Sequence, residues 1–134
     1  MGSFAQASWR PTPWELKSLA RQQHVQSLGR VDQLWPWLEQ RHGALMAVDA
    51  PHAAHPEHFT YAELSQRIST AAAGFRSLGI REGDVVGLFA ENSPRGLMAD
   101  QGLMRAGAAD AVRGASAPVE ELRYILEDAK AVAL

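Results

Sequence analysis

The chain has 134 residues, of which 46% are hydrophobic, so its composition is that of a globular domain and excludes a disordered segment. Its 13 basic and 15 acidic side chains give a formal net charge of −2, which excludes a basic surface large enough to bind nucleic acid through its phosphates. Cysteine is absent, which excludes disulfides, thiolate metal sites and a cysteine nucleophile.

Residues 1–43 are predicted to form an N-terminal helical segment. A first helix is expected to start near Trp14 and to run to Leu28. A second is expected to start at Asp32, an N-cap candidate, with Pro36 tolerated only near its beginning. No apolar run approaches the roughly 20 residues that cross a bilayer, and the first residues lack the pattern of a secretory signal. We therefore expect a cytoplasmic location.

All four tryptophans fall in this segment, at Trp9, Trp14, Trp35 and Trp37. One interpretation is that they pin the N-terminal helices onto the body of the protein. The other is an interfacial patch, since tryptophan beside lysine and arginine suits a membrane surface. This second interpretation makes the chain a non-catalytic module that docks on a membrane or on a partner, and it predicts peripheral membrane contact.

Residues 44–134 are predicted to form a partial α/β subdomain. It opens with a strand over 44–49, which residues 58–60 are expected to join as a hairpin. Three histidines recur at every third position between and within these strands, namely His52, His55 and His58. Pro56 breaks any helix that would stack the three rings. The pattern therefore predicts a solvent-exposed histidine loop and not a metal site.

The stretch 59–92 predicts a capped helix that leads into a buried strand. Thr60 and Glu63 have the spacing of a capping box, and Phe59 and Leu64 that of a hydrophobic staple. The apolar residues then recur every three or four positions, at Leu64, Ile68, Ala71, Phe75 and Leu78. Gly79 is expected to end the helix in a left-handed conformation.

The rest of the chain repeats this alternation of strand and helix. Strands are expected over 85–90, 108–112 and 131–134, and the first of these is apolar on both faces. One helix is expected between the first two strands, capped by Ser93 with Pro94 at its first position and ended by Gly107. Another is expected before the last strand, capped by Ser116 or Ala117 and running to Ala129. Connections this short predict parallel strands with right-handed crossovers. The sequence therefore predicts an α/β fold with N-terminal helices and a partial parallel sheet. Because its last residues read as a strand, the chain is expected to be a fragment.

No catalytic, cofactor-binding or metal-ligating residue is predicted. Two pairs of glycines five positions apart, in 74–79 and 102–107, lack the Lys-Ser or Lys-Thr of a phosphate loop and lie at the ends of predicted helices. Asn92, Ser93 and Pro94 stand where a strand meets a helix N-terminus, which is the usual ligand position in such sheets. A helix cap explains Ser93 without a ligand.

Several short blocks together resemble the opening of the adenylate-forming acyl synthetases, the AMP-binding enzymes. They are Phe59–Leu64, Ala72–Ile80, Glu82–Ser93, Met104–Ala108, Asp110–Gly114 and Pro118–Asp128. The last two look most like the long-chain fatty acid–acyl carrier protein ligases of cyanobacteria and plastids, which are relatives of the acyl-CoA synthetases. The resemblance covers about residues 31–134.

The resemblance implies a two-step ligase that uses ATP with magnesium. Fatty acid and ATP would give an acyl-adenylate and pyrophosphate, and the thiol of acyl carrier protein or of coenzyme A would then take the acyl group. The family's phosphate loop, its later adenine-binding motifs and its C-terminal domain with the catalytic lysine have no counterpart here. The resemblance therefore implies an N-terminal fragment that is inactive alone, holds no cofactor and, with strand edges left open, associates with itself.

Overall fold

The structure is a computed structural model that describes residues 12–18, 28–52 and 56–134. The chain forms two compact units, residues 1–30 and 31–134. In the first, residues 13–18 are helical and begin with a capping box, because the Thr12 N–H donates to Glu15 Oε2 (2.7 Å) and the Glu15 N–H donates to Thr12 Oγ1 (3.3 Å). The remainder of the helix predicted up to Leu28, and Trp9, lie outside the described residues. The predicted division into 1–43 and 44–134 stays a prediction.

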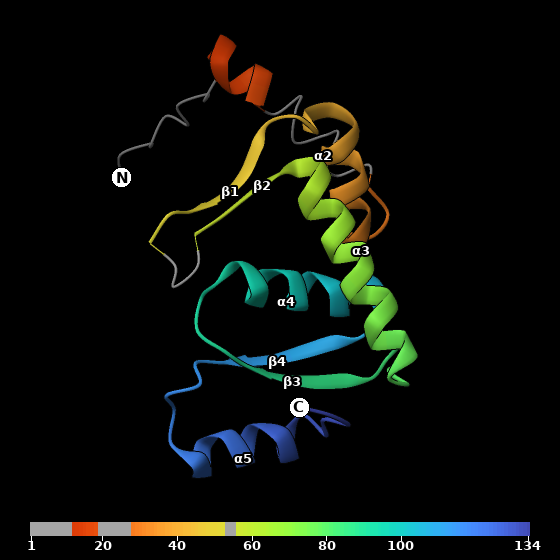
Figure 1. Cartoon of the computed structure of the whole chain (residues 1–134). Helices are drawn as coiled ribbons and strands as arrows, with labels where there is room; N and C mark the ends of the chain where they lie inside the picture. The colour runs from red at the N-terminus through yellow and green to blue at the C-terminus, as the bar shows by residue number, and fades with distance from the viewer. Residues whose placement is uncertain (1–11, 19–27, 53–55) are drawn as a thin grey trace, which may run out of the picture. The chain divides into compact units, whose positions relative to one another are not determined.

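The second unit is a mixed arrangement of helices and strands (Figure 1). Its elements in chain order are η1 (Val31–Gln33), α2 (Leu34–His42), β1 (Met46–Ala50), β2 (Glu57–Thr60), α3 (Tyr61–Ser77), β3 (Val85–Phe89), α4 (Pro94–Ala106), β4 (Ala109–Arg113) and α5 (Val119–Asp128). Strands β1 and β2 form an antiparallel hairpin, whereas β3 and β4 are parallel. The predicted α/β fold with a small parallel sheet is thus confirmed.

Helix α3 starts and stops where its local sequence dictates. Thr60 Oγ1 accepts from the Glu63 N–H (3.2 Å), and the Thr60 N–H donates to Glu63 Oε2 (2.8 Å), so the predicted capping box is confirmed. Beyond the last turn, Gly79 adopts a φ of 96°, and the Ile80 N–H donates to the Phe75 carbonyl oxygen (3.1 Å). A residue with a Cβ is strained at such a positive φ, which is why glycine ends the helix.

The core consists of two clusters on either side of the contact between α3 and α4. The first contains Phe59, Leu64 and Ile68, with Trp35, Ala47, Val48, Leu97 and Met98 packed against it. The second contains Val86, Leu103 and Ala108, with Phe75, Ile80 and Ala133 packed against it. The two helices approach closely at Gly102, where an added Cβ would lie 2.8 Å from the Ala71 Cβ. Phe59 and Leu64 share the first cluster, as the hydrophobic staple predicts.

Helices cover both faces of the β3–β4 pair, as the apolar run 85–90 predicts. Figure 1 shows α4 along one face and α5 along the other, and both helices contact both strands. On the α5 side, an added Cβ at Gly87 would lie 2.5 Å from Leu126 Cδ2. At the end of β4, Arg113 Nε donates to Glu121 Oε1 (2.6 Å), which ties the strand to the first turn of α5.

Most predicted strand ends differ from the structure by one or two residues, and the starts of two helices differ in their capping residue. Asp32 lies in the 3-10 helix η1 and does not cap α2, whose N-cap is Gln33 without a side-chain hydrogen bond. Neither Ser116 nor Ala117 caps α5, because the helix starts after Pro118, whose carbonyl oxygen accepts from the Leu122 N–H (3.1 Å).

The strand predicted over 131–134 is reduced to one parallel bridge between Val86 and Ala133. Two hydrogen bonds hold it, from the Gly87 N–H to the Ala133 carbonyl oxygen and from the Val132 N–H to the Val85 carbonyl oxygen, both 2.8 Å. The left-handed Lys130, with a φ of 51°, turns the chain immediately before this bridge. The pairing with β3 therefore begins only at Val132.

Candidate functional site

The candidate site is a cavity of about 420 Å³ at the carboxyl ends of β3 and β4. Its walls are Leu88, Ala90, Glu91, Asn92, Ser93, Gly96, Leu97, Asp100 and Val112. They come from the ends of two parallel strands and the first turns of the intervening helix α4. In open α/β sheets, ligands bind at this position.

The start of α4 forms one wall of the cavity. Ser93 has an extended backbone, and its Oγ accepts from the Gly96 N–H (3.0 Å), with Pro94 buried at the first helical position. Both predictions for this helix start are confirmed. The Ser93 oxygen is thus committed to the cap, although its hydroxyl hydrogen remains able to donate. Asn92 and Ser93 line the cavity as the sequence suggests, and their role toward a ligand stays a prediction.

Two neighbouring carboxyl groups, Asp100 on α4 and Asp110 on β4, lie where this helix packs on this strand. Asp110 Oδ2 is buried and accepts no hydrogen bond within the described part of the chain. Burial, together with the adjacent Asp100 carboxyl, raises the pKa of Asp110 to about 6. At neutral pH the two carboxylates repel each other where they are partly shielded from water, and this repulsion destabilises the folded chain.

A series of hydrogen bonds between side chains connects the Asp100 carboxylate to α2, near the start of the second unit. Trp35 Nε1 donates to Gln101 Oε1, and Gln101 Nε2 donates to Asp100 Oδ2, both at 2.7 Å. Trp35 also packs against the first core cluster. This favours, for Trp35, the interpretation that the tryptophans pin the N-terminal helices onto the body. Trp37 instead carries the Arg41 guanidinium over its ring at 4.6 Å.

The carboxyl pair predicts that Asp110→Asn stabilises the chain at neutral pH. The pKa of Asp110 is near 3.8 without the fold and about 6 within it, so the folded chain binds more protons between these values and its stability falls as the pH rises through them. We expect the substitution to raise the free energy of unfolding by about 1 kcal/mol at pH 7.5, a value kept small by solvent screening. Below the pH range bounded by these two pKa values, we expect no gain. Urea unfolding on both sides of this range measures it.

The matched control is Asp128→Asn, which removes an exposed carboxylate at the end of α5. It should change stability by less than about 0.5 kcal/mol at either pH. If the stability of the Asp110→Asn variant depends on pH in the same way as that of the parent chain, the raised pKa of Asp110 is wrong.

Sequence reasoning missed both the carboxyl pair and the Trp35–Gln101 bond. A signal for the first exists, because Asp110 interrupts the otherwise small and apolar strand 108–112. A carboxylate in the middle of a buried strand needs a partner or a raised pKa. No such signal exists for the second, since its two residues are 66 positions apart.

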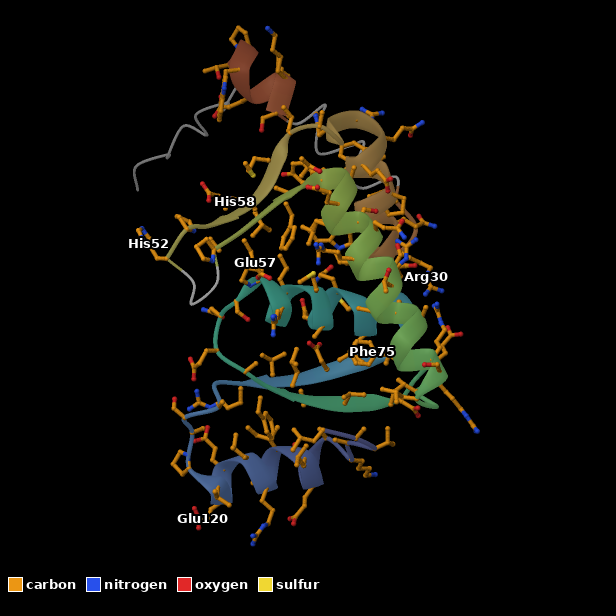
Figure 2. The ribbon with its side chains drawn as sticks, in the orientation of Figure 1. Arg30, His52, Glu57, His58, Phe75 and Glu120 are labelled. Atoms are coloured by element: carbon orange, nitrogen blue, oxygen red, sulfur yellow. The ribbon has the colours of Figure 1, made fainter. Side chains whose placement is uncertain are left out.

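The expected pairing of residues 58–60 with the first strand is confirmed, because His58 lies in β2 opposite Asp49 of β1, and its Nδ1 lies 2.8 Å from Asp49 Oδ1. His58 is exposed, as predicted, but it belongs to this strand and not to the loop. His52 is exposed in the turn after β1, and Figure 2 shows both rings near the tip of the hairpin. His55 lies outside the described residues. Within those residues, no three histidine, cysteine, aspartate or glutamate side chains are grouped to hold a metal ion.

The charge of the cavity affects which ligands it can hold. Glu91 and Asp100 give it negative charge, which disfavours a phosphate at the N-terminus of α4. Of the glycines in 74–79 and 102–107, Gly79 and Gly107 end helices, Gly102 forms a packing contact with α3, and Gly74 lies inside α3. Of the helices that the structure describes, none is both long enough and apolar enough to cross a membrane.

Comparison with known proteins finds one family whose model matches most of the chain. The family model of AMP-binding enzymes matches residues 36–134. Two proteins of Arabidopsis thaliana, "Probable acyl-activating enzyme 16, chloroplastic" and "Long-chain-fatty-acid--[acyl-carrier-protein] ligase AEE15, chloroplastic", are 39% and 38% identical to the chain over 104 residues. The match covers 78% of this chain and 14% of each relative.

A solved structure shows the same arrangement. The N-terminal subdomain of NpsA from Klebsiella oxytoca superposes with a TM-score of 0.71 at 25% identity, over 78% of this chain and 26% of that one. A fatty acyl CoA synthetase of Mycobacterium tuberculosis, at 22% identity, gives a TM-score of 0.71 over 76% of this chain and 20% of that one and supports the fold alone.

Proposed function

The chain belongs to the AMP-binding enzyme family, and on that premise we propose that it supplies the N-terminal α/β scaffold of a ligase that activates a long-chain fatty acid as its adenylate. The observation that carries the proposal is the 38% identity to the fatty acid–acyl carrier protein ligase, over most of this chain. In the proposed reaction, the fatty acid carboxylate and ATP give an acyl-adenylate and pyrophosphate, and a thiol then takes the acyl group as a thioester and releases AMP.

Acyl carrier protein is the proposed thiol acceptor, and coenzyme A is the alternative. The first rests on the name of the plant ligase, which shares 104 aligned residues with this chain. The second rests on more distant relatives, a 2-succinylbenzoate–CoA ligase at 41% identity and a crotonobetaine/carnitine–CoA ligase at 37%, each aligned over fewer than 80 residues. The longer match favours the carrier protein.

The described residues do not fit ATP with its magnesium ion. Glu91 and Asp100 give the cavity a negative charge that repels phosphates, and among the described residues no three histidine, cysteine, aspartate or glutamate side chains are grouped to hold a metal ion. The chain spans only 14% of the length of the plant relatives that it matches. We therefore propose that segments outside this sequence bind the nucleotide and its metal ion, and we assign no step of the reaction to residues of this chain.

What this chain contributes in the proposal is a rigid framework. Helices α4 and α5 enclose the β3–β4 pair, and α3 fixes α4 through the close contact at Gly102. Such packing holds the carboxyl ends of the strands in place, and these ends are the edge where ligands of α/β sheets bind. Binding groups from other segments would then be positioned against this edge.

A chimera tests the proposal. Residues 31–134 would replace the segment of the Arabidopsis fatty acid–acyl carrier protein ligase that aligns with them. Because the scaffold is proposed to be equivalent, we expect fatty-acid-dependent ATP–pyrophosphate exchange within about tenfold of the plant enzyme, a loss below about 1.4 kcal/mol. A chimera that melts like the plant enzyme but exchanges no pyrophosphate would contradict it. A chimera carrying Leu78→Ala, an exposed position, serves as the control for surface changes.

Three further expectations remain predictions. They are a cytoplasmic location with peripheral membrane contact, self-association of the chain, and the division at residue 43. The plant relatives have chloroplast names, which concern those proteins. Self-association is supported by the outer edge of β4, which pairs with no other strand among the described residues.

A further inference from the structure

A second hollow, separate from the strand ends, lies between α3 and α4. It has a volume of about 540 Å³, and its lining includes Arg67, Ala71, Phe75, Arg95, Met98 and Ala99. Figure 2 shows Phe75 on α3 pointing toward α4, which places an aromatic ring on the groove. Two arginines, one from each helix, thus share a groove whose other lining residues are apolar except for Thr70.

The two helices are basic although the chain as a whole has a net charge of −2. Their charged side chains are Arg67, Arg76, Arg95 and Arg105 against Glu63 and Asp100. Glu63 stands one helical turn before Arg67 and offsets part of its charge, although its carboxylate also accepts hydrogen bonds from the backbone and side chain of Thr60. Asp100 lines the cavity at the strand ends, and Arg95 has no acidic neighbour of this kind on its own helix turn. The groove therefore presents a local excess of positive charge.

The four arginines have different tasks. Arg76 donates to the Arg105 carbonyl oxygen, and Arg105 donates to the Asp32 carbonyl oxygen (3.4 Å), so these two connect elements within the fold. The Arg67 guanidinium lies 4.3 Å from the centre of the Phe59 ring. Within the described residues, neither Arg67 nor Arg95 forms an ion pair. Both guanidinium groups are exposed and remain able to bind a carboxylate.

We propose that this groove docks an acidic amphipathic helix of a partner protein. Glutamate or aspartate side chains of the partner bind Arg67 and Arg95, and its apolar side chains lie against Phe75 and Met98. The small Ala71 and Ala99 allow a helix backbone to approach the groove. Helix-in-groove recognition uses this combination of an apolar channel and flanking charges. The proposal concerns a surface away from the strand ends and does not depend on the proposed ligase activity.

The shape of the groove favours a protein segment over a small molecule. Small-molecule pockets bury most of the ligand surface, whereas this groove is shallow and largely open to solvent. The charge of the groove decides the sign of the partner. An acidic helix gains from both arginines, while a basic helix meets repulsion at both.

Binding of a labelled peptide to the full 134-residue chain tests the proposal. The probe is a fluorescein-labelled helix with leucine along one face and glutamate beside it, followed by anisotropy. We expect Arg67→Gln and Arg95→Gln each to weaken binding about threefold and the double variant to weaken it about tenfold. Thr70→Glu, which adds a negative charge at an exposed position of the groove, should weaken it similarly.

Matched controls separate docking from general charge effects. Arg123→Gln removes the same charge from an exposed position on α5 and should leave binding unchanged. Equal binding of a peptide with lysine in place of glutamate would overturn the proposal, as would equal binding by the double variant. Binding of phosphatidylglycerol vesicles through the same arginines, without binding of the acidic peptide, would assign the groove to a membrane surface and overturn it too.

Discussion

Gly102→Val is expected to destabilise the chain by about 2 to 3 kcal/mol, which lowers its melting temperature by roughly 10 °C. The reason is the contact between α3 and α4. A Cβ at Gly102 would lie 2.8 Å from the Ala71 Cβ, 3.3 Å from the Ala72 nitrogen and 3.3 Å from Phe75 Cε2. All three neighbours belong to α3, and the Ala71 Cβ and the Ala72 nitrogen cannot retreat without moving that helix. Thermal unfolding followed by circular dichroism measures the effect.

Gly74 provides the matched control because it is also a helical glycine, on α3, and an added Cβ there would meet nothing within 4 Å. Gly74→Ala should stabilise the chain by about 0.5 to 1 kcal/mol, since alanine loses less backbone entropy in a helix than glycine. Gly102→Ala should instead destabilise it. If Ala at the two positions shifts the melting temperature equally, the close packing of α3 on α4 is wrong.

The elements with local causes could be predicted from the sequence. Thr60 with Glu63 fixes the start of α3 and Gly79 its end, because the groups that bond or bend lie within a few residues of one another. Ser93 and Gly107 do the same for α4. The apolar run 85–90 predicted a strand covered on both faces for the same reason. Each of these predictions depends on contacts that a short window of sequence contains.

The candidate site could not be predicted in this way. The Asp100–Asp110 pair forms only because α4 packs on β4, and the Trp35–Gln101 bond forms only because α2 reaches α4. The start of α5 failed for a smaller reason, since Ser116 has good capping chemistry but lies in a turn in which the Ala117 N–H donates to the Gly114 carbonyl oxygen. A residue with a good capping side chain does not cap a helix when another hydrogen bond already fixes its backbone in a turn.

The absence of a predicted reaction centre follows from the residue types. Serine, histidine and carboxylate side chains are present, but the histidines that the structure describes lie in α2 and in and beside the hairpin, whereas Ser93 and Asp110 lie at the β3–β4 pair. Acid–base or nucleophilic catalysis needs such groups within hydrogen-bonding distance of one another. Among the described residues, these groups are therefore not brought together into one such arrangement.

The second large effect is an absence of catalysis by the chain alone. We expect no fatty-acid-dependent ATP–pyrophosphate exchange from the 134 residues with magnesium and a long-chain fatty acid, although enzymes typically accelerate reactions by at least about a millionfold. The reason is that the cavity at the strand ends is negatively charged and that no three potential metal ligands are grouped among the described residues. ATP should also leave the melting temperature unchanged, because a ligand that does not bind does not stabilise.

The most direct measurement is this exchange, run side by side on the chain, on the Arabidopsis ligase and on the chimera of the two. Incorporation of labelled pyrophosphate into ATP at the no-enzyme level for the chain, with exchange by the other two, is the predicted result. Exchange by the chain itself that requires the fatty acid and disappears on heating would show a complete reaction centre in these 134 residues and would contradict the account.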